Sequence, residues 1–199
     1  MTARNLWLVA PYALWMLLMA VLPTSPLSYA VRTAAVAAVL AFALWRLRSV
    51  GEVRFRIRSA DAAAGVAVGL LVFAAWVLPE QFDWALYRRF CVVGEGGTPS
   101  APDSGAALLA FRLVGSAFVI SVAEELFFRR WLLRFAGFWW MVALFAVEHG
   151  DRWHVGALAG IGYGLLAKRY GLLSAIVAHS VTNLVLGLSV ILANQWQYW

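Results

Sequence analysis

A small set of polar residues interrupts long apolar stretches of this 199-residue sequence, and these residues are the ones that could carry out chemistry. The set comprises Glu124, Glu125, Arg129, His149, His179 and Asn183. A charged side chain within an apolar membrane helix costs several kcal/mol unless it is paired or solvated. Each of these residues therefore needs a structural partner or a functional role.

Two adjacent carboxylates, Glu124 and Glu125, are followed closely by Arg129. On a helix, Glu125 and Arg129 share one face at a spacing of four residues, so we expect them to form a structural ion pair. Glu124 points about 100° away from Glu125 around the helix. It is therefore free to face the interior of a bundle and to act as a general base. The ordinary alternative is a helix end that carries interfacial charges.

His149 ends a short apolar run. A single histidine at a helix end is commonly an interfacial side chain, so His149 alone would indicate little. If it faces Glu124, its ring can orient a water molecule for deprotonation. Its neighbours Glu148, Asp151 and His154 lie at or beyond the end of the run, and we expect them to be solvated or connecting residues.

His179 and Asn183 lie four residues apart in the last apolar run, so they project from one face of a helix. Both side chains can donate hydrogen bonds to a developing oxyanion. The alternative is a polar contact between helices, worth about 1 kcal/mol for each contact. Together with Glu124 and His149, they supply the groups needed for peptide hydrolysis by an activated water, without a serine or cysteine nucleophile.

The elements that must position these residues are membrane helices. The sequence is 63% hydrophobic and 13% charged, with a mean hydropathy of +0.78, whereas soluble domains have about 25% charged residues. A helix needs about 20 residues to cross a bilayer. The apolar runs therefore predict an all-α fold, a polytopic transmembrane bundle of about seven helices in a single domain over residues 1–199. The runs are 6–22, 27–45, 62–78, 106–128, 138–148, 153–167 and 172–193.

Basic residues are distributed unevenly between these runs. When the chain is traced through seven crossings, 11 of the 16 lysines and arginines, including the cluster from Arg46 to Arg58, fall on the side of the amino terminus. The positive-inside rule places this side in the cytoplasm, and the carboxyl terminus and the long 79–105 loop outside. The clusters explain the net charge of +6 as a topology signal. We therefore expect a lipid bilayer and no nucleic acid as partner.

Three motifs occur in order on separate apolar runs: EExxxR at Glu124, Glu125 and Arg129, FxxxH at Phe145 and His149, and HxxxN at His179 and Asn183. From residue 106 to the carboxyl terminus, with a motif-bearing core at about 106–193, the sequence resembles the CPBP (Abi) family of intramembrane proteases. This family includes the type II CAAX prenyl endopeptidases. The stretches 124–134, 179–187 and 195–199 are most similar to the bacterial CAAX-protease-related proteins associated with exosortase and carboxyl-terminal sorting systems.

The resemblance implies a glutamate-type intramembrane endopeptidase of the bacterial inner (cytoplasmic) membrane, with no cofactor and no metal. It implies these roles: Glu124 as catalytic base, His149 as the residue that positions water, His179 and Asn183 as the oxyanion site, and Glu125, Arg129 and Phe145 as structural residues. The implied substrate is a peptide or protein with a membrane-associated carboxyl-terminal segment, in association with a sorting system. A prenylated tail, a sorting signal and a leader peptide all stay open.

Two alternatives compete with this hypothesis. A carboxylate and two histidines could bind zinc, but the sequence has no HExxH motif, and Phe145 occupies the first ligand position of an inverted HxxEH frame that ends at Glu148 and His149. The other alternative is a non-enzymatic scaffold or immunity protein that retains a protease fold. Loss of Glu124, His149 or His179 would favour it, and all three are present.

Overall fold

The computed structural model describes residues 3–53, 55–82 and 105–198. This part of the chain contains seven main helical segments and no strand, so the predicted all-α bundle of about seven helices is confirmed. The segments are α1 (Ala3–Val21), α2 (Pro26–Ser49), α3 (Ser59–Gln81), a continuous helix from Ala106 to Ala136, α8 (Phe138–Glu148), α9 (Trp153–Tyr170) and α10 (Leu172–Ala193). Arg54 and most of the expected outer loop, residues 83–104, lie outside the described residues.

The helix from Ala106 to Ala136 changes its winding twice. Its sections are α5 (Ala106–Val114), the π-helical η1 (Gly115–Ile120), α6 (Ser121–Glu125), the π-helical η2 (Leu126–Leu132) and α7 (Leu133–Ala136). A π-helical turn shifts the register of the side chains on either side of it and is frequent at functional sites. The two glutamates at the end of α6 therefore lie between two such shifts.

Five of the helices are long and apolar enough to cross a membrane: α1, α2, α3, the Ala106–Ala136 helix and α10. The other two differ from the expected crossings. With 11 residues, α8 extends about 16 Å, roughly half of the hydrocarbon thickness. The 18-residue α9 ends with Lys168 and Arg169, which lower its apolar character. These two helices form a hairpin that packs against the longer ones.

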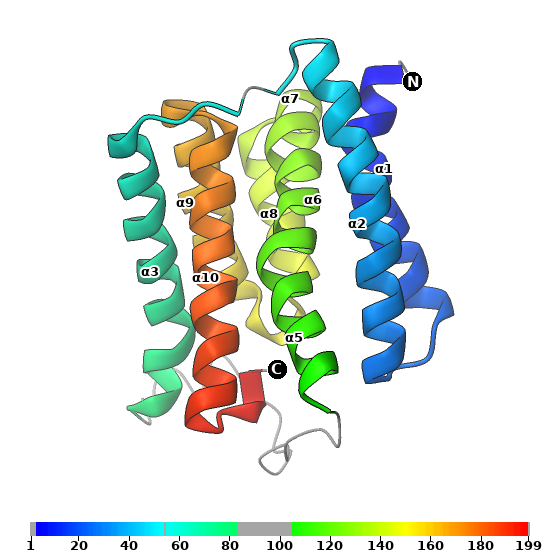
Figure 1. Ribbon diagram of the computed structural model, residues 1–199. Helices are drawn as coiled ribbons and strands as arrows, with labels where there is room; N and C mark the ends of the chain where they lie inside the picture. Colours follow the sequence, from blue (N-terminus) through cyan, green and yellow to red (C-terminus); the bar gives the residue numbers. More distant parts are fainter. Residues whose placement is uncertain (1–2, 54, 83–104, 199) are drawn as a thin grey trace.

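Successive helices run in opposite directions, so the amino and carboxyl ends of the described chain lie at opposite ends of the bundle (Figure 1). The carboxyl-terminal end of α2, the start of α3 and the turns at Gly137 and Gly171 all lie at the amino-terminal end of the bundle, as the distribution of basic residues predicts (Figure 1). Both glycines have positive φ values, 84° and 94°, which favour glycine at these sharp turns. Arg129 differs from the expectation for this group, because it is buried inside the bundle.

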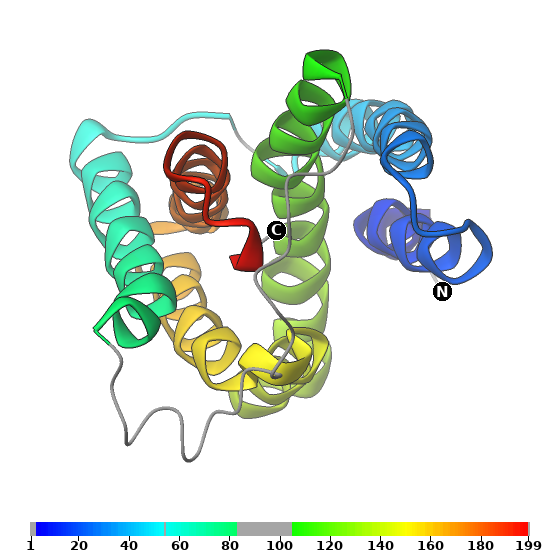
Figure 2. The same ribbon diagram turned by 90° about the horizontal axis from the view of Figure 1, so that it is seen from below.

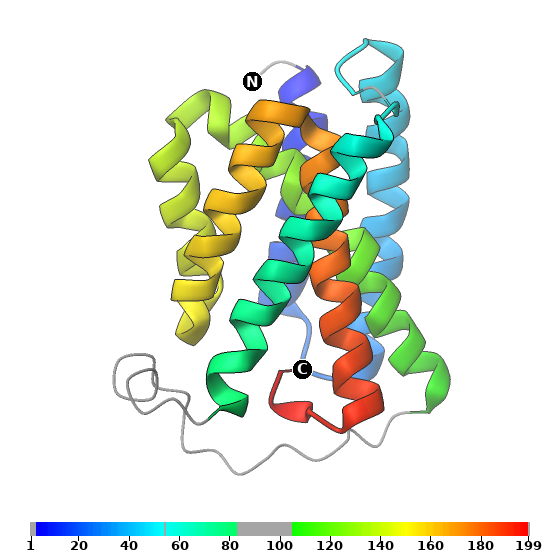
Figure 3. The same ribbon diagram turned by 90° about the vertical axis from the view of Figure 1, so that its left-hand side faces the viewer.

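The helices surround α10, which contacts α3, α9 and the Ala106–Ala136 helix. Viewed along the bundle, the α1–α2 hairpin lies on the other side of the Ala106–Ala136 helix from α3 (Figure 2). From the side, α3 lies in front of α9 and α10 (Figure 3). Gly65 and Gly69 let α3 approach α10 closely, because a Cβ atom at either position would come within 2.7 Å of a backbone oxygen of α10. The motif-bearing helices are therefore held at short distances from one another.

Candidate active site

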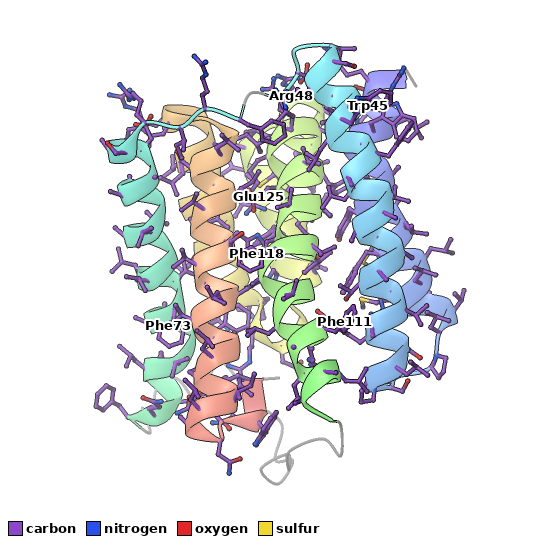
Figure 4. All side chains as sticks on the ribbon, in the orientation of Figure 1. Trp45, Arg48, Phe73, Phe111, Phe118 and Glu125 are labelled. Carbon is purple, nitrogen blue, oxygen red and sulfur yellow. The ribbon has the colours of Figure 1, made fainter. Side chains whose placement is uncertain are left out.

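The glutamate pair lies in the interior of the bundle. Glu125 is fully buried and Glu124 is 8% exposed. Figure 4 shows Glu125 between Phe118 and the arginine-rich end of the bundle, the end that carries Arg46, Arg48 and Arg56. Two carboxylates at this depth require compensating charge and hydrogen bonds.

Arg129 supplies one compensating charge. Its Nη1 lies 3.0 Å from Glu125 Oε1, and neither side chain is exposed, so the ion pair expected from the four-residue spacing is present. The guanidinium carbon also lies 3.9 Å from the centroid of the Phe145 ring. Phe145 thereby stabilises the buried cation through a cation–π contact. The structural roles predicted for Glu125, Arg129 and Phe145 are consistent with one contiguous cluster.

His179 of α10 lies between the two glutamates. Its Nδ1 is 2.9 Å from Glu125 Oε1, and its Nε2 is 3.6 Å from Glu124 Oε2. The first distance is a hydrogen bond; the second is too long for one and is a separation that a bridging water commonly spans. The ring stacks on Tyr163, with centroids 5.0 Å apart. These contacts fix the orientation of the imidazole, with Nε2 directed at Glu124.

His149 lies just after α8, and its ring contacts Phe145 and Trp76. Its Nδ1 is 2.7 Å from the backbone oxygen of Phe145. A carbonyl only accepts hydrogen bonds, so Nδ1 carries the proton and Nε2 of the neutral ring is an acceptor. A Cβ atom on Gly156 would lie 2.9 Å from His149 Cβ and Cγ. The absence of a side chain at Gly156 therefore makes room for the His149 ring.

The amide of Asn183, predicted to donate to the oxyanion, donates to groups of the protein in this structure. Its amide nitrogen donates to the backbone oxygen of Ser116, at 3.0 Å, and to the hydroxyl of Ser121, at 3.1 Å. Ser116 O also accepts from the Ser121 hydroxyl at 2.9 Å. The Asn183 amide therefore connects α10 to Ser116 in η1 and to Ser121 in α6, one turn along α10 from His179.

The sequence analysis missed Glu148 and Tyr12. The expectation that Glu148 is solvated is wrong: its Oε2 atom is buried, the hydroxyl of Tyr12 in α1 donates a hydrogen bond to its carboxylate, and it interacts electrostatically with Glu124 and Glu125. Asp151 is exposed, as expected. Glu148 ends an apolar run and directly precedes His149, a position that could have indicated a site residue. Tyr12 lies outside all three motifs, and nothing in the sequence connects it with Glu148.

A metal site would need several ligating side chains close together. Within the ranges that the structure describes, no three histidine, cysteine, aspartate or glutamate side chains are grouped so that they could hold a metal ion. The arrangement provides a carboxylate, two histidines with fixed orientations and a nearby arginine.

Comparison with known proteins identifies the region that holds these residues. Residues 106–185 match the family described as type II CAAX prenyl endopeptidase Rce1-like. No curated protein and no solved structure gives a significant match. The matched segment contains Glu124, Glu125, Arg129, His149, His179 and Asn183. The match covers residues 106–185 of the 199-residue chain, so this segment is similar to the type II CAAX prenyl endopeptidases, a group of membrane endopeptidases.

Proposed function

We propose that this protein is an intramembrane endopeptidase in which the Glu124 carboxylate activates a water molecule. The observation that carries the proposal is the 3.6 Å separation between Glu124 Oε2 and His179 Nε2, two groups from different helices in an apolar interior. Water bound beside Glu124 can lose a proton to the carboxylate while it attacks the peptide carbonyl carbon. The proton then passes to the leaving amine, so Glu124 ends the cycle as it began.

Charge balance supports different roles for the two glutamates. Glu125 Oε1 is bound by both Arg129 and His179, so this oxygen is committed to structure. Among the described residues, the ion pair of Glu124 is the more distant one to His179. One arginine compensates one of these carboxylates, and a proton shared between Glu124 and His179 Nε2 compensates the other. A mobile proton at this position is what general acid–base catalysis requires.

His149 is suited to position the water. Because Nδ1–H donates to Phe145 O, Nε2 can accept a hydrogen bond from a water molecule. The attacking water would then be held by two acceptors, Glu124 and His149, with its lone pair directed away from both. This orientation favours attack on a carbonyl carbon.

His179 and Asn183 form the proposed oxyanion site. In its protonated form, His179 donates from Nδ1 to Glu125 and from Nε2 to the oxyanion, which develops negative charge in the transition state. The Asn183 amide joins this site by exchanging its hydrogen bond with the Ser121 hydroxyl for one to the oxyanion. Its bond to Ser116 O keeps the side chain in place during this exchange.

The proposed substrate is a peptide or protein whose carboxyl-terminal segment associates with the membrane. A prenylated CAAX tail is the substrate class that the family description names. A sorting signal with its own membrane helix fits the similarity of this sequence to exosortase-associated proteins, and a leader peptide is the third class. We place the protein in a bacterial inner membrane, with the arginine-rich end in the cytoplasm.

The test uses the purified chain in lipid nanodiscs with two synthetic peptides. One ends in a farnesylated CAAX sequence, and the other ends in an unmodified apolar segment followed by basic residues. Mass spectrometry of the products should show cleavage of at least one peptide by the wild-type chain and none by Glu124→Gln. Binding of both peptides without cleavage would instead support a scaffold function.

A further inference from the structure

A cavity of about 370 Å³ lies at the arginine-rich end of the bundle, away from the glutamate pair. Three segments far apart in the sequence line it: the connection after α2, the η2 section and the turn between α9 and α10. Its polar lining includes Arg56, Arg130 and Tyr170. None of these residues has a role in the proposed reaction.

Positive charge around this cavity exceeds negative charge. Glu52 forms ion pairs with Arg4, Arg130 and Arg134, at 3.5, 2.7 and 2.6 Å. Three arginines share one carboxylate, which leaves an excess of two positive charges (3 − 1 = 2) before Arg56 is counted. Glu52 is therefore already saturated by these arginines, of which Arg130 lines the cavity, and it does not neutralise them.

Two further features suit an anionic ligand that has an apolar part. The cavity wall includes Leu172 and Leu173, at the start of the 22-residue α10, where the N-cap Gly171 offers no side-chain hydrogen bond to the first turn. The free backbone N–H groups and the helix dipole add positive potential to that of the arginines. Phe55 and Ile57 are exposed at the same end, 50% and 38% respectively, as expected at the level of lipid headgroups.

We propose that this cavity binds the phosphate group of an anionic phospholipid from the adjacent leaflet, with Arg56 and Arg130 as the principal contacts. Clusters of basic residues beside membrane helices bind anionic headgroups. A guanidinium group forms two parallel hydrogen bonds with phosphate oxygens, and Arg56 has no ion pair among the described residues. The lipid phosphate would add negative charge that balances the arginines, which Glu52 alone does not neutralise.

The experiment measures lipid binding directly, so it does not depend on peptide cleavage. Native mass spectrometry of the full chain, released from detergent, counts bound phosphatidylglycerol and phosphatidylcholine for the wild type, Arg56→Gln and Arg48→Gln. Arg48 is the matched control: it is exposed at the same end but does not line the cavity. We expect wild-type protein to retain phosphatidylglycerol in preference to phosphatidylcholine. Arg56→Gln should weaken retention by roughly fivefold and Arg48→Gln should leave it unchanged.

Two results would overturn the proposal. Equal losses in Arg56→Gln and Arg48→Gln would show that binding reflects general surface charge. Displacement of phosphatidylglycerol by millimolar inorganic phosphate would show that the site takes free phosphate, without a preference for lipid.

Discussion

The imidazole of His179 and the carboxylate of Glu125 meet 2.9 Å apart, although 54 residues separate them in the sequence. Glu125 Oε1 also binds Arg129, so one oxygen atom connects the ion pair of one helix to the histidine of another. This contact holds Nε2 of His179 toward Glu124. In the proposed mechanism the two adjacent glutamates therefore serve different purposes: Glu125 positions His179, and Glu124 is left to react.

Replacement of Glu125 by glutamine should destabilise the protein. The change leaves the guanidinium of Arg129 buried without its carboxylate, which costs about 3 kcal/mol or more. Thermal unfolding of purified protein in detergent should show a clear decrease in melting temperature. Asp61→Asn is the control, because its partner Arg58 is 78% exposed, and that pair should contribute little. Similar melting temperatures for Glu125→Gln and Asp61→Asn would contradict the structural role of Glu125.

Addition of one methyl group beside His149 should disturb the position of the water. In Gly156→Ala, the new Cβ atom would lie 2.9 Å from the His149 side chain, so the ring must move. A displacement of about 1 Å at a catalytic group can cost up to roughly 100-fold in rate, and we expect a tenfold to hundredfold decrease in kcat. Gly160→Ala is the matched control in the same helix, since its Cβ atom would meet nothing closer than 3.4 Å. Full activity of Gly156→Ala would argue against a role for the His149 ring.

Asn183 should affect turnover more than its structural hydrogen bonds alone predict. Loss of an oxyanion donor costs about 10² to 10³ in kcat with little change in substrate affinity, so Asn183→Ala should show this decrease. Asn183→Asp should be at least as damaging, because it directs a negative charge at the oxyanion. Ser121→Ala removes one hydrogen-bond partner of Asn183 and keeps the amide itself. If Ser121→Ala lowers kcat as much as Asn183→Ala does, Asn183 is only a contact between helices.

The two ends of the bundle should face different compartments. Eleven of the 16 basic residues belong to the side of the amino terminus in the sequence, which predicts a cytoplasmic amino terminus. Alkaline phosphatase fused at the carboxyl terminus should be active, since this reporter folds only outside the cytoplasm. A reporter at the same place that is active only in the cytoplasm would contradict the proposed orientation.

The spacing of residues along the sequence predicted the contacts that form within a single helix. The pair formed by Glu125 and Arg129 follows from a four-residue separation, and the helical class follows from apolar runs of membrane length. The approach of His179 to Glu125 depends on how α10 packs against α6, which helical periodicity does not specify. The same limit applies to the contact between Tyr12 and Glu148.

The structure also differs from the sequence-based expectation in the winding of the Ala106–Ala136 helix, in the contacts of Asn183 and in the burial of Arg129. The π-helical winding of η1 and η2 is a small register change within a continuous helix, and no residue type marks it in the sequence. The engagement of Asn183 follows from it, because Ser116 O, in η1, accepts from both Asn183 and Ser121. The burial of Arg129 reflects its pairing with Glu125, which outweighs the tendency of arginine to extend to the membrane surface.

The most direct test of the account is the cleavage rate of Glu124→Gln, measured with a peptide that the wild-type chain cleaves in nanodiscs. Glutamine keeps the size of the side chain and removes its basic group. The account predicts a decrease of about 10² to 10⁴ in kcat, with a melting temperature close to that of the wild type. Cleavage by folded Glu124→Gln within tenfold of the wild-type rate would contradict the assignment of Glu124 as the base that activates water.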